Sequence, residues 1–377
     1  MRVAYLAGQR AMTHYAGTDT KALYARVGRN TGNMAFTTAI ADQLDAEISF
    51  RGWSTSPELL AEADLVVMPC ANQFGSHTDL GQLGDLLLEA DVPVLAIGLG
   101  AQSSAATDDA EPTPGTLHWA RAVARLRYSD TPNILVRGEY TRSQLAKHGI
   151  TSTEVIGCPS HFLSGRRNLG ESIESRVTGT EPERIATLAA RSTASNLKVV
   201  DQIMVSLAAG STQGLPWVLQ EELELIDLAR GKDVDPADLA RLTRHFAPGL
   251  DPELFEQWAR SNAVVFFEIE AWIEHMQRFE VCVGPRFHGA MMAMQAGTPA
   301  VVVTHDSRTK ELCDTTGLPS VPAQDLEDQG PRAMWATLRS FDGRAFDANR
   351  AQLAKTYVTL LKGHGLAARG TLAALAR

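Results

Sequence analysis

The feature that most constrains the fold of this chain is an alternation of short, continuously apolar runs with segments of helical periodicity. The runs lie at residues 3–7, 47–50, 65–68, 93–98, 134–137 and 154–157. Between them apolar residues recur every fourth position, as at Phe36, Ile40 and Leu44, which indicates a helix with one apolar stripe. Such strands, alternating with helices, form parallel sheets that helices cover on both faces. The sequence therefore predicts an α/β protein whose first domain is Rossmann-like.

The length of the chain, 377 residues, exceeds one ordinary domain of about 100–200 residues, so we expect two. A first Rossmann-like domain is expected over 1–165. The composition then shifts to Gly, Ser, Arg and Glu, which indicates a linker over 166–196. A second Rossmann-like domain is expected over 197–330. Residues 331–377 are expected to form C-terminal helices that can pack back on the first domain.

The composition excludes several classes of protein. Hydrophobic residues make up 44% and charged residues 21%, as in soluble globular proteins. The longest apolar stretch, 92–101, is half of the about 20 residues that span a membrane, so we expect a cytoplasmic protein without an integral membrane segment. The net charge of −9 argues against nucleic acid as a partner. Four cysteines, at positions 70, 158, 282 and 313, lack C-x-x-C spacing and are expected to be buried thiols.

The most informative segment reads as a βαβ unit. A strand is expected at 280–284, a turn at 285–289, a helix of small residues at 290–296 that ends at Gly297, and the next strand at 298–303. Ligands of such units bind beyond the carboxyl ends of the strands, near helix amino ends. Arg286 and His288 stand at that place, and together they can hold an anion and exchange a proton with it. The alternative is an arginine paired with an acidic neighbour and a histidine that caps a turn.

Two further strand ends carry charged side chains. His305, Asp306 and Arg308 follow the next strand, where we expect them to position loops or to touch a substrate. A metal site at His305 and Asp306 is not expected, because no third ligand lies at a usable spacing. Arg137 follows residues 134–136 and precedes a helix expected at 139–148. It is a second candidate anion clamp, and pairing with Glu139 is the alternative.

Two segments of the first domain complete the set of candidates. Gly98 and Gly100 would let backbone approach a ligand closely, with Gln102 beside them, although the full G-x-G-x-x-G spacing is missing. Asn30 and Asn33 supply a polar entry to the first amphipathic helix, where either is most simply an N-cap. The sequence contains no G-x-S-x-G, P-loop or H-E-x-x-H motif.

The sequence resembles the polysaccharide pyruvyl transferases. The resemblance lies in residues 29–33, 64–69, 93–102, 135–139 and 155–160, and above all in the Arg-x-His-Gly block at 283–290 with Ala-Gly-x-Pro at 296–299. It implies two Rossmann-like domains that face a cleft, in a GT-B-like arrangement. It also implies transfer of the enolpyruvyl carbons of phosphoenolpyruvate to sugar hydroxyls of a cell-surface polysaccharide or its precursor, as a pyruvate ketal.

The same resemblance implies that residues 1–165 form the acceptor side and residues 197–330 the phosphoenolpyruvate site, and it implies roles for individual residues. Arg286 and His288, with Phe287 and Gly289, would hold phosphoenolpyruvate, and Arg137 would reach it from the opposite domain. His288 would act as the general acid. Phosphoenolpyruvate is then a co-substrate, no cofactor or metal is implied, and the acceptor is a sugar or a lipid-linked or polymeric glycan. The sequence departs from the family pattern at Phe287, where Leu is more usual, and after Asn33, where an acidic residue is more usual.

Two other functions share these features. A GT-B glycosyltransferase that uses a nucleotide sugar would have the same fold. A glycan-binding relative without catalytic activity would also have it, because a fold does not fix a function. The sequence leaves the oligomeric state open.

Overall fold

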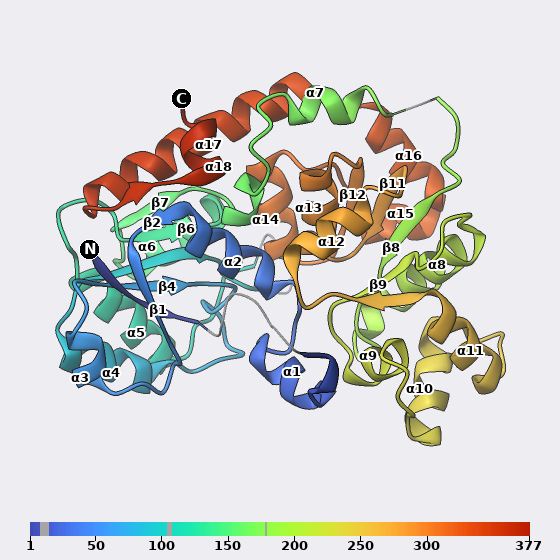
Figure 1. The fold of residues 1–377 in the computed structure, drawn as a ribbon, viewed down its shortest axis with the longest axis horizontal. Coiled ribbons are helices and arrows are strands. Elements are labelled where there is room, and N and C mark those ends of the chain that lie inside the picture. Colours follow the sequence, from blue (N-terminus) through green and yellow to red (C-terminus); the bar gives the residue numbers. More distant parts are fainter. Residues whose placement is uncertain (8–14, 104–107, 178) are drawn as a thin grey trace.

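Two parallel β-sheets, each covered by helices, lie side by side in the protein (Figure 1). The structure is a computed structural model and describes residues 1–7, 15–103, 108–177 and 179–377. It confirms the expected class, an α/β protein of two Rossmann-like domains that face a cleft.

The first sheet has the strand order β3-β1-β4-β5-β6-β7. Alternate residues of its strands enter two different cores: Tyr5 and Val67 pack toward α2, whereas Ala4 and Val66 face the opposite side. The elements are β1 (Arg2–Leu6), η1 (Tyr15–Gly17), α1 (Thr20–Arg26), α2 (Asn33–Gln43), β3 (Glu47–Arg51), α3 (Pro57–Ala61), β4 (Leu65–Pro69), α4 (Gly81–Ala90), β5 (Val94–Leu99), α5 (Pro114–Arg125), β6 (Ile134–Val136), α6 (Glu139–Lys147), β7 (Thr153–Val155) and η2 (Pro159–Phe162).

The second sheet has the strand order β10-β9-β8-β11-β12-β13, a doubly wound order in which the chain reverses direction between β8 and β11. Its elements are β8 (Ile185–Leu188), η3 (Ser195–Leu197), α8 (Lys198–Gly210), β9 (Trp217–Leu219), α9 (Leu223–Ala229), α10 (Pro236–Phe246), α11 (Pro252–Asn262), β10 (Ala263–Val265), α12 (Ile269–Met276), β11 (Val281–Gly284), α13 (Phe287–Ala296), β12 (Ala300–Thr304), α14 (Ser307–Thr316), β13 (Ser320–Pro322), α15 (Ala323–Gln329) and α16 (Pro331–Arg339).

Two local expectations are corrected. The second sheet begins with β8, inside the segment 166–196 expected as a linker, and the run from Leu197 forms η3 and α8 instead of opening the unit. Its three apolar residues, Ile185, Ala186 and Leu188, are too few to stand out in a polar segment. The turn expected at 285–289 is also shorter, because Phe287, His288 and Gly289 already form the first turn of α13.

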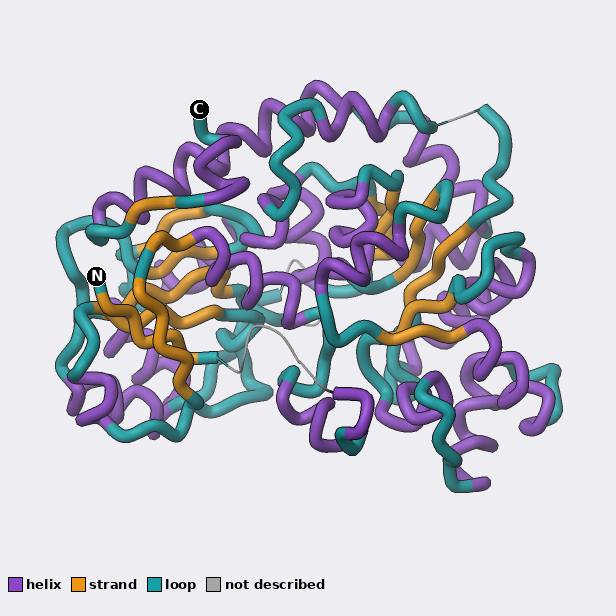
Figure 2. The backbone as a smooth tube through the Cα atoms, viewed as in Figure 1, coloured by secondary structure: helices purple, strands orange, loops and turns teal. Residues whose placement is uncertain are grey.

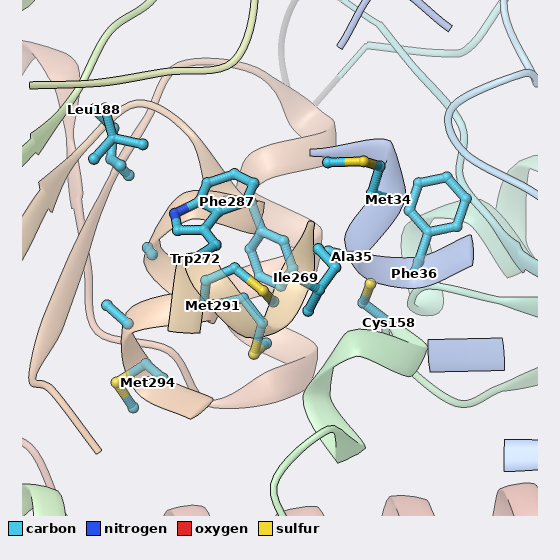
Figure 3. Close-up of a cluster of buried hydrophobic side chains, with 14 of the residues drawn as sticks. Met34, Ala35, Phe36, Cys158, Leu188, Ile269, Trp272, Phe287, Met291 and Met294 are labelled. Atoms are coloured by element: carbon cyan, nitrogen blue, oxygen red, sulfur yellow. The ribbon is translucent and has the colours of Figure 1, made fainter. Parts of the chain in front are cut away.

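One apolar cluster runs through both domains, as the close-up in Figure 3 shows. Met34 and Phe36 enter it from α2, Phe287 and Met291 from α13, and Trp272 from α12. All of these side chains are nearly fully buried. Since buried apolar area is the main source of stabilisation, the interface between the domains behaves as part of the core.

The C-terminal segment ties the two halves together. In Figures 1 and 2 the long helix α17 (Gly343–Gly363) extends along one side of the molecule above both sheets. It packs on α7 (Leu169–Glu174), on η2 and on α14, while β14 (Ala367–Ala368) pairs antiparallel with β2 (Leu44–Asp45) and α18 (Gly370–Leu375) packs on α2. Arg350 of α17 is buried and donates to the carbonyl of His161 at 2.8 Å. None of the described helices combines the length and apolar character needed to cross a bilayer.

Candidate functional site between the two domains

The amino end of α13 is the centre of the candidate site. β11 ends at Gly284, which has a φ of 147° and would place a Cβ atom 2.7 Å from the backbone oxygen of Leu188. A Cβ on Gly289 would lie 2.6 Å from Leu188 Cδ2 and 2.8 Å from Gln220 Nε2. Position 284 therefore requires glycine, whereas a Cβ on Gly289 would force the side chains of Leu188 and Gln220 to shift. The two glycines bring the first turn of α13 against the carboxyl ends of β8 and β9.

Arg286, the residue before α13, is paired. Its Nε donates to the carbonyl of Ala189 at 3.0 Å, and its Nη2 lies 2.9 Å from Glu221 Oε2. Glu221 also pairs with Arg191 at 2.6 Å and accepts from Asn30 Nδ2 at 2.6 Å. The acidic neighbour considered in the sequence is thus Glu221, whose carboxylate sits where a substrate carboxylate would meet the guanidinium fork.

Arg137 reaches the same place from the first domain. It follows β6, is 2% exposed, and donates to the carbonyls of Gly98 at 2.7 Å and Cys70 at 3.2 Å. The expected alternative of pairing with Glu139 is wrong, because Glu139 pairs with Arg142 at 2.7 Å. Among the described residues no carboxylate forms an ion pair with Arg137; its buried charge is met by these carbonyls and by the ring of Phe36, 5.4 Å from its Cζ. Burial lowers the pKa of Arg137, although a guanidinium remains charged.

His288 lies between the domains as the second residue of α13. Its ring centroid is 5.5 Å from that of Phe36, and its Nε2 lies 3.5 Å from the Sγ of Cys158. Burial, and then the positive charges of Arg137 and Arg308, hold the pKa of His288 well below its usual value of 6.5. The imidazole is therefore uncharged at neutral pH in the free protein.

These side chains line one cavity. Arg137, Arg286, His288 and Arg308 face it together with Asn30, Gln220, Pro285, Phe287, Thr309 and Leu312. Its volume is about 30 Å³, room for about one water molecule. Gln220 is 1% exposed, and its Nε2 has no hydrogen-bond partner within the described part of the chain. An unmet donor of this kind costs about 1–3 kcal/mol, so the Gln220 amide can donate to an acceptor atom in the cavity, such as a water or ligand oxygen.

Of the three charged residues expected after β12, only Arg308 lines the cavity. Asp306 caps α14 by accepting from the amide of Thr309 at 2.7 Å, and it pairs with Arg308 at 3.3 Å. His305 contacts Asp306 at 3.8 Å, but neither residue lines the cavity. No group of three or more His, Cys, Asp or Glu that could hold a metal occurs within the described residues.

Glu311 of α14 reaches across to the other domain. Its carboxylate accepts from the amide of Thr141 at 2.6 Å and from the Thr141 hydroxyl at 2.8 Å, in the first turn of α6. Burial raises the pKa of Glu311 to about 7, against the lowering effect of the Thr141 hydrogen bonds. The carboxyl group thus serves as a cap that one domain supplies to a helix of the other.

The glycines of the first domain do not line this cavity. Gly98 has a φ of 81°, and its carbonyl holds Arg137. A Cβ on Gly100 would lie 3.1 Å from Cδ of Arg137. Gln102 Oε1 accepts a hydrogen bond from Asn72 Nδ2, and Gln102 does not line the cavity. These positions allow backbone to approach the buried arginine closely.

The two asparagines at the start of α2, Asn30 and Asn33, face different cavities. Asn30 lines the cavity, and its Oδ1 accepts from the amide of Gly32 at 2.8 Å. The expected capping by Asn30 or Asn33 is wrong, because Gly32 is the N-cap of α2 and no side chain caps the helix. Asn33 is the first residue of α2, and its Nδ2 donates back to the carbonyl of Val27 at 3.0 Å. Asn33 faces a different, larger cavity.

The sequence reasoning missed three side chains of the site. Gln220 and Glu221 directly follow the apolar residues 217–219, so the strand-end rule that found Arg286 would have found them. Cys158, a buried free thiol as expected, carries no signal that would link it to His288, because only the meeting of the domains brings the two together.

The fold and the site define a two-domain α/β protein with a small cavity in the cleft that is lined by arginines from both halves. The family model of polysaccharide pyruvyl transferases matches residues 17–307. The chain therefore belongs to the polysaccharide pyruvyl transferase family, which makes it a transferase of polysaccharide modification.

Solved structures with a similar course of the chain are distant in sequence. S. aureus MnaA in a co-structure with UDP has a TM-score of 0.46 at 11% identity, with 96% of this chain and 98% of that chain covered. The UDP-GlcNAc 2-epimerase from Neisseria meningitidis bound to UDP-GlcNAc has a TM-score of 0.45 at 12% identity, covering 96% and 100%. A glycosyltransferase from Rickettsia africae has 0.46 at 8% identity, covering 96% and 98%. No curated protein matches the chain.

Proposed function

We propose that the protein transfers the enolpyruvyl carbons of phosphoenolpyruvate to two hydroxyls of a sugar, forming a pyruvate ketal on a polysaccharide or its precursor. The observation that carries the proposal is the shared cavity, where Arg137 of one domain meets Arg286, Arg308 and His288 of the other. Phosphoenolpyruvate bears a carboxylate and a phosphate, and planar guanidinium groups bind both kinds of anion with paired hydrogen bonds. The unpartnered Gln220 amide supplies one more donor.

In the proposed reaction C2 of phosphoenolpyruvate becomes electrophilic twice, once before each of the two sugar hydroxyls attacks it. His288, in its protonated form, donates a proton to the methylene carbon, so that C2 becomes an oxocarbenium-like centre. A sugar hydroxyl attacks C2 and loses its proton. The bond between C2 and the phosphate oxygen then breaks, inorganic phosphate leaves, and a second hydroxyl closes the ketal ring. The arginines stabilise the charge that develops on the departing phosphate, and no further cofactor is needed.

His288 is uncharged in the free protein, so its imidazole must take up a proton when the substrate binds before it can act as a general acid. Arg137 and Arg308 contribute to the lowered pKa of His288. The negative charges of bound phosphoenolpyruvate oppose the field of these arginines, which raises the pKa of the imidazole in the complex. Protonation of the general acid is thus coupled to binding.

The cleft must also widen. A cavity of about 30 Å³ cannot hold phosphoenolpyruvate, which has ten non-hydrogen atoms. Binding therefore requires the domains to move apart or the Arg286–Glu221 pair to open.

The test is phosphate release from phosphoenolpyruvate in the presence of a panel of lipid-linked and nucleotide-linked sugars, together with melting temperatures. We expect phosphoenolpyruvate to raise the melting temperature and at least one acceptor to stimulate phosphate release. Arg137→Ala and Arg286→Ala should each abolish both effects. A protein stabilised by a uridine or guanosine diphosphate sugar but not by phosphoenolpyruvate would be a glycosyltransferase instead. A protein that binds glycan yet releases no phosphate with any acceptor would be a binding module.

A further inference from the structure

A second cavity lies at the reversal point of the first sheet. The chain runs from β1 to β3 on one side and returns with β4 on the other, so β1 and β4 are neighbours. Beyond their carboxyl ends, Leu6 of β1 and Pro69 of β4 line a cavity of about 290 Å³. Open α/β sheets bind ligands at this kind of place. The second sheet carries the arginine cavity at its own reversal point, beside β8 and β11, so the two reversal points face one cleft.

The lining of the second cavity suits a sugar ring. Trp53 is 40% exposed, and its Nε1 donates to the carbonyl of Leu6 at 3.2 Å, which fixes the indole at the rim. The floor is apolar, with Leu6 and Met34, and Arg26 and Asn33 stand in the wall. A pyranose has C–H faces that stack on an aromatic ring and hydroxyls around its edge, so it matches an aromatic plate with polar groups beside it.

The volume sets the size of the ligand. At about 290 Å³, the cavity is at the lower end of the range for small-molecule sites, which fits one or two sugar rings better than a complete nucleotide sugar. A larger cavity of about 490 Å³ lies at the amino ends of β8, β11 and β12, beside Arg184 and Pro299. That is the opposite edge of the sheet from His288, so it cannot present an acceptor to the reacting carbon.

The second cavity shares its wall with the arginine cavity. Phe36 lines it, and the same ring lies 5.5 Å from the ring of His288 and 5.4 Å from Cζ of Arg137. The loop before α2 also divides the two, since Gly28 and Asn33 face the second cavity and Asn30 faces the arginine cavity. A sugar in the second cavity is thus one aromatic ring away from the proposed donor.

We propose that this cavity is the acceptor subsite, which takes a pyranose ring of the glycan on Trp53 and directs two hydroxyls past Phe36 toward His288. The role of this sugar as the acceptor rests on the proposed function. The binding of a sugar in the second cavity does not depend on the proposed function. Trp53 is then a specificity-determining residue that touches the acceptor and not phosphoenolpyruvate.

The experiment measures the binding of methyl pyranosides and of phosphoenolpyruvate separately, on the full chain. A panel of methyl glucoside, galactoside, mannoside and N-acetylmannosaminide is titrated by calorimetry and by tryptophan fluorescence. Trp53→Ala should weaken the bound glycoside at least tenfold, and Trp53→Phe, which keeps an aromatic plate, less than about threefold. Tyr128→Ala, which removes an exposed aromatic side chain from another surface, should change nothing. The fluorescence response of the wild type should disappear in Trp53→Phe, although that variant still binds by calorimetry.

The outcomes separate the subsite from the proposed function. Loss of glycoside binding in Trp53→Ala with unchanged phosphoenolpyruvate affinity supports the subsite. Glycoside binding that depends on Trp53 in a protein that does not bind phosphoenolpyruvate keeps the subsite and removes the proposed function. Wild-type protein that binds none of the glycosides, or a folded Trp53→Ala protein that binds them as the wild type does, overturns the subsite. If Trp53→Ala fails to fold, Arg26→Ala in the same wall takes its place with the same expected loss.

Discussion

At the scale of single residues, the protonation of His288 links the structure to the chemistry. Its pKa lies well below 6.5 in the free protein, from burial and from Arg137 and Arg308. Under the proposed function, phosphoenolpyruvate raises that pKa when it binds, so at pH 7 binding should take up as much as one proton. Calorimetry in buffers of different ionisation enthalpy measures the uptake. Turnover should fall as the pH rises through the raised pKa of the complex, because the general acid is then deprotonated.

Phosphoenolpyruvate itself titrates near neutral pH, so its own proton uptake must be separated from that of His288. A variant at position 288 makes this separation possible. His288→Gln keeps a polar side chain but cannot exchange a proton in this range. We expect turnover to fall by a factor of about 10²–10⁴, while the calorimetric proton uptake drops to that of the ligand alone. Equal uptake in the two proteins, or wild-type turnover in a folded His288→Gln protein, would show that the proton comes from elsewhere.

At the scale of elements, the joint between α14 and α6 should make stability depend on pH. The pKa of Glu311 is about 7 in the folded protein against 4.5 as its ordinary value, so the folded state binds this proton more tightly. The stability it contributes is complete below about 4.5 and is lost as the pH rises to about 7. The difference of about 2.5 pKa units corresponds to at most about 3 kcal/mol.

Glu311→Gln removes this dependence because the amide is neutral at every pH. Relative to wild type, the variant should gain stability between pH 5 and pH 8, as followed by the melting temperature at each pH. Glu62→Gln, an exposed position, is the matched control and should show no such trend. A constant difference between Glu311→Gln and wild type over this range would mean that the carboxyl group does not titrate there.

How much the sequence could predict also differs from element to element. The sequence predicts the strand ends that precede Arg137, Arg286 and Arg308, because an apolar run comes before each of them. β8 has three apolar residues, Ile185, Ala186 and Leu188, inside a polar segment, so the start of the second sheet does not stand out in the sequence. Glu221 follows the apolar run 217–219, and the strand-end rule finds it only when that run is interpreted as a strand. Contacts such as Cys158 with His288 depend on how two domains dock, and no local pattern encodes that arrangement.

At the scale of the whole molecule, the reaction depends on how closely the domains approach at Gly32. This residue has a φ of −60°, which alanine also adopts, so only space is at issue. A Cβ there would lie 2.5 Å from Gln220 Oε1 and 3.2 Å from Cβ of His288. Gly32→Ala therefore places a wedge between the domains at the arginine cavity, while the core of each domain keeps its packing.

We expect Gly32→Ala to remain folded by circular dichroism but to lose at least tenfold in kcat/KM for phosphoenolpyruvate, since small displacements of reacting groups are costly. Gly210→Ala, at the end of α8 with nothing within 4 Å of the added Cβ, controls for the change of residue type and should retain full activity. Gly32→Ala should lower kcat/KM for both substrates, because it shifts Arg137 relative to Arg286 and also shifts the acceptor cavity relative to His288. Trp53→Ala should affect the acceptor alone. Full activity of Gly32→Ala would mean that catalysis takes place in a more open arrangement, in which the two arginines act on the phosphate and carboxylate at separate times.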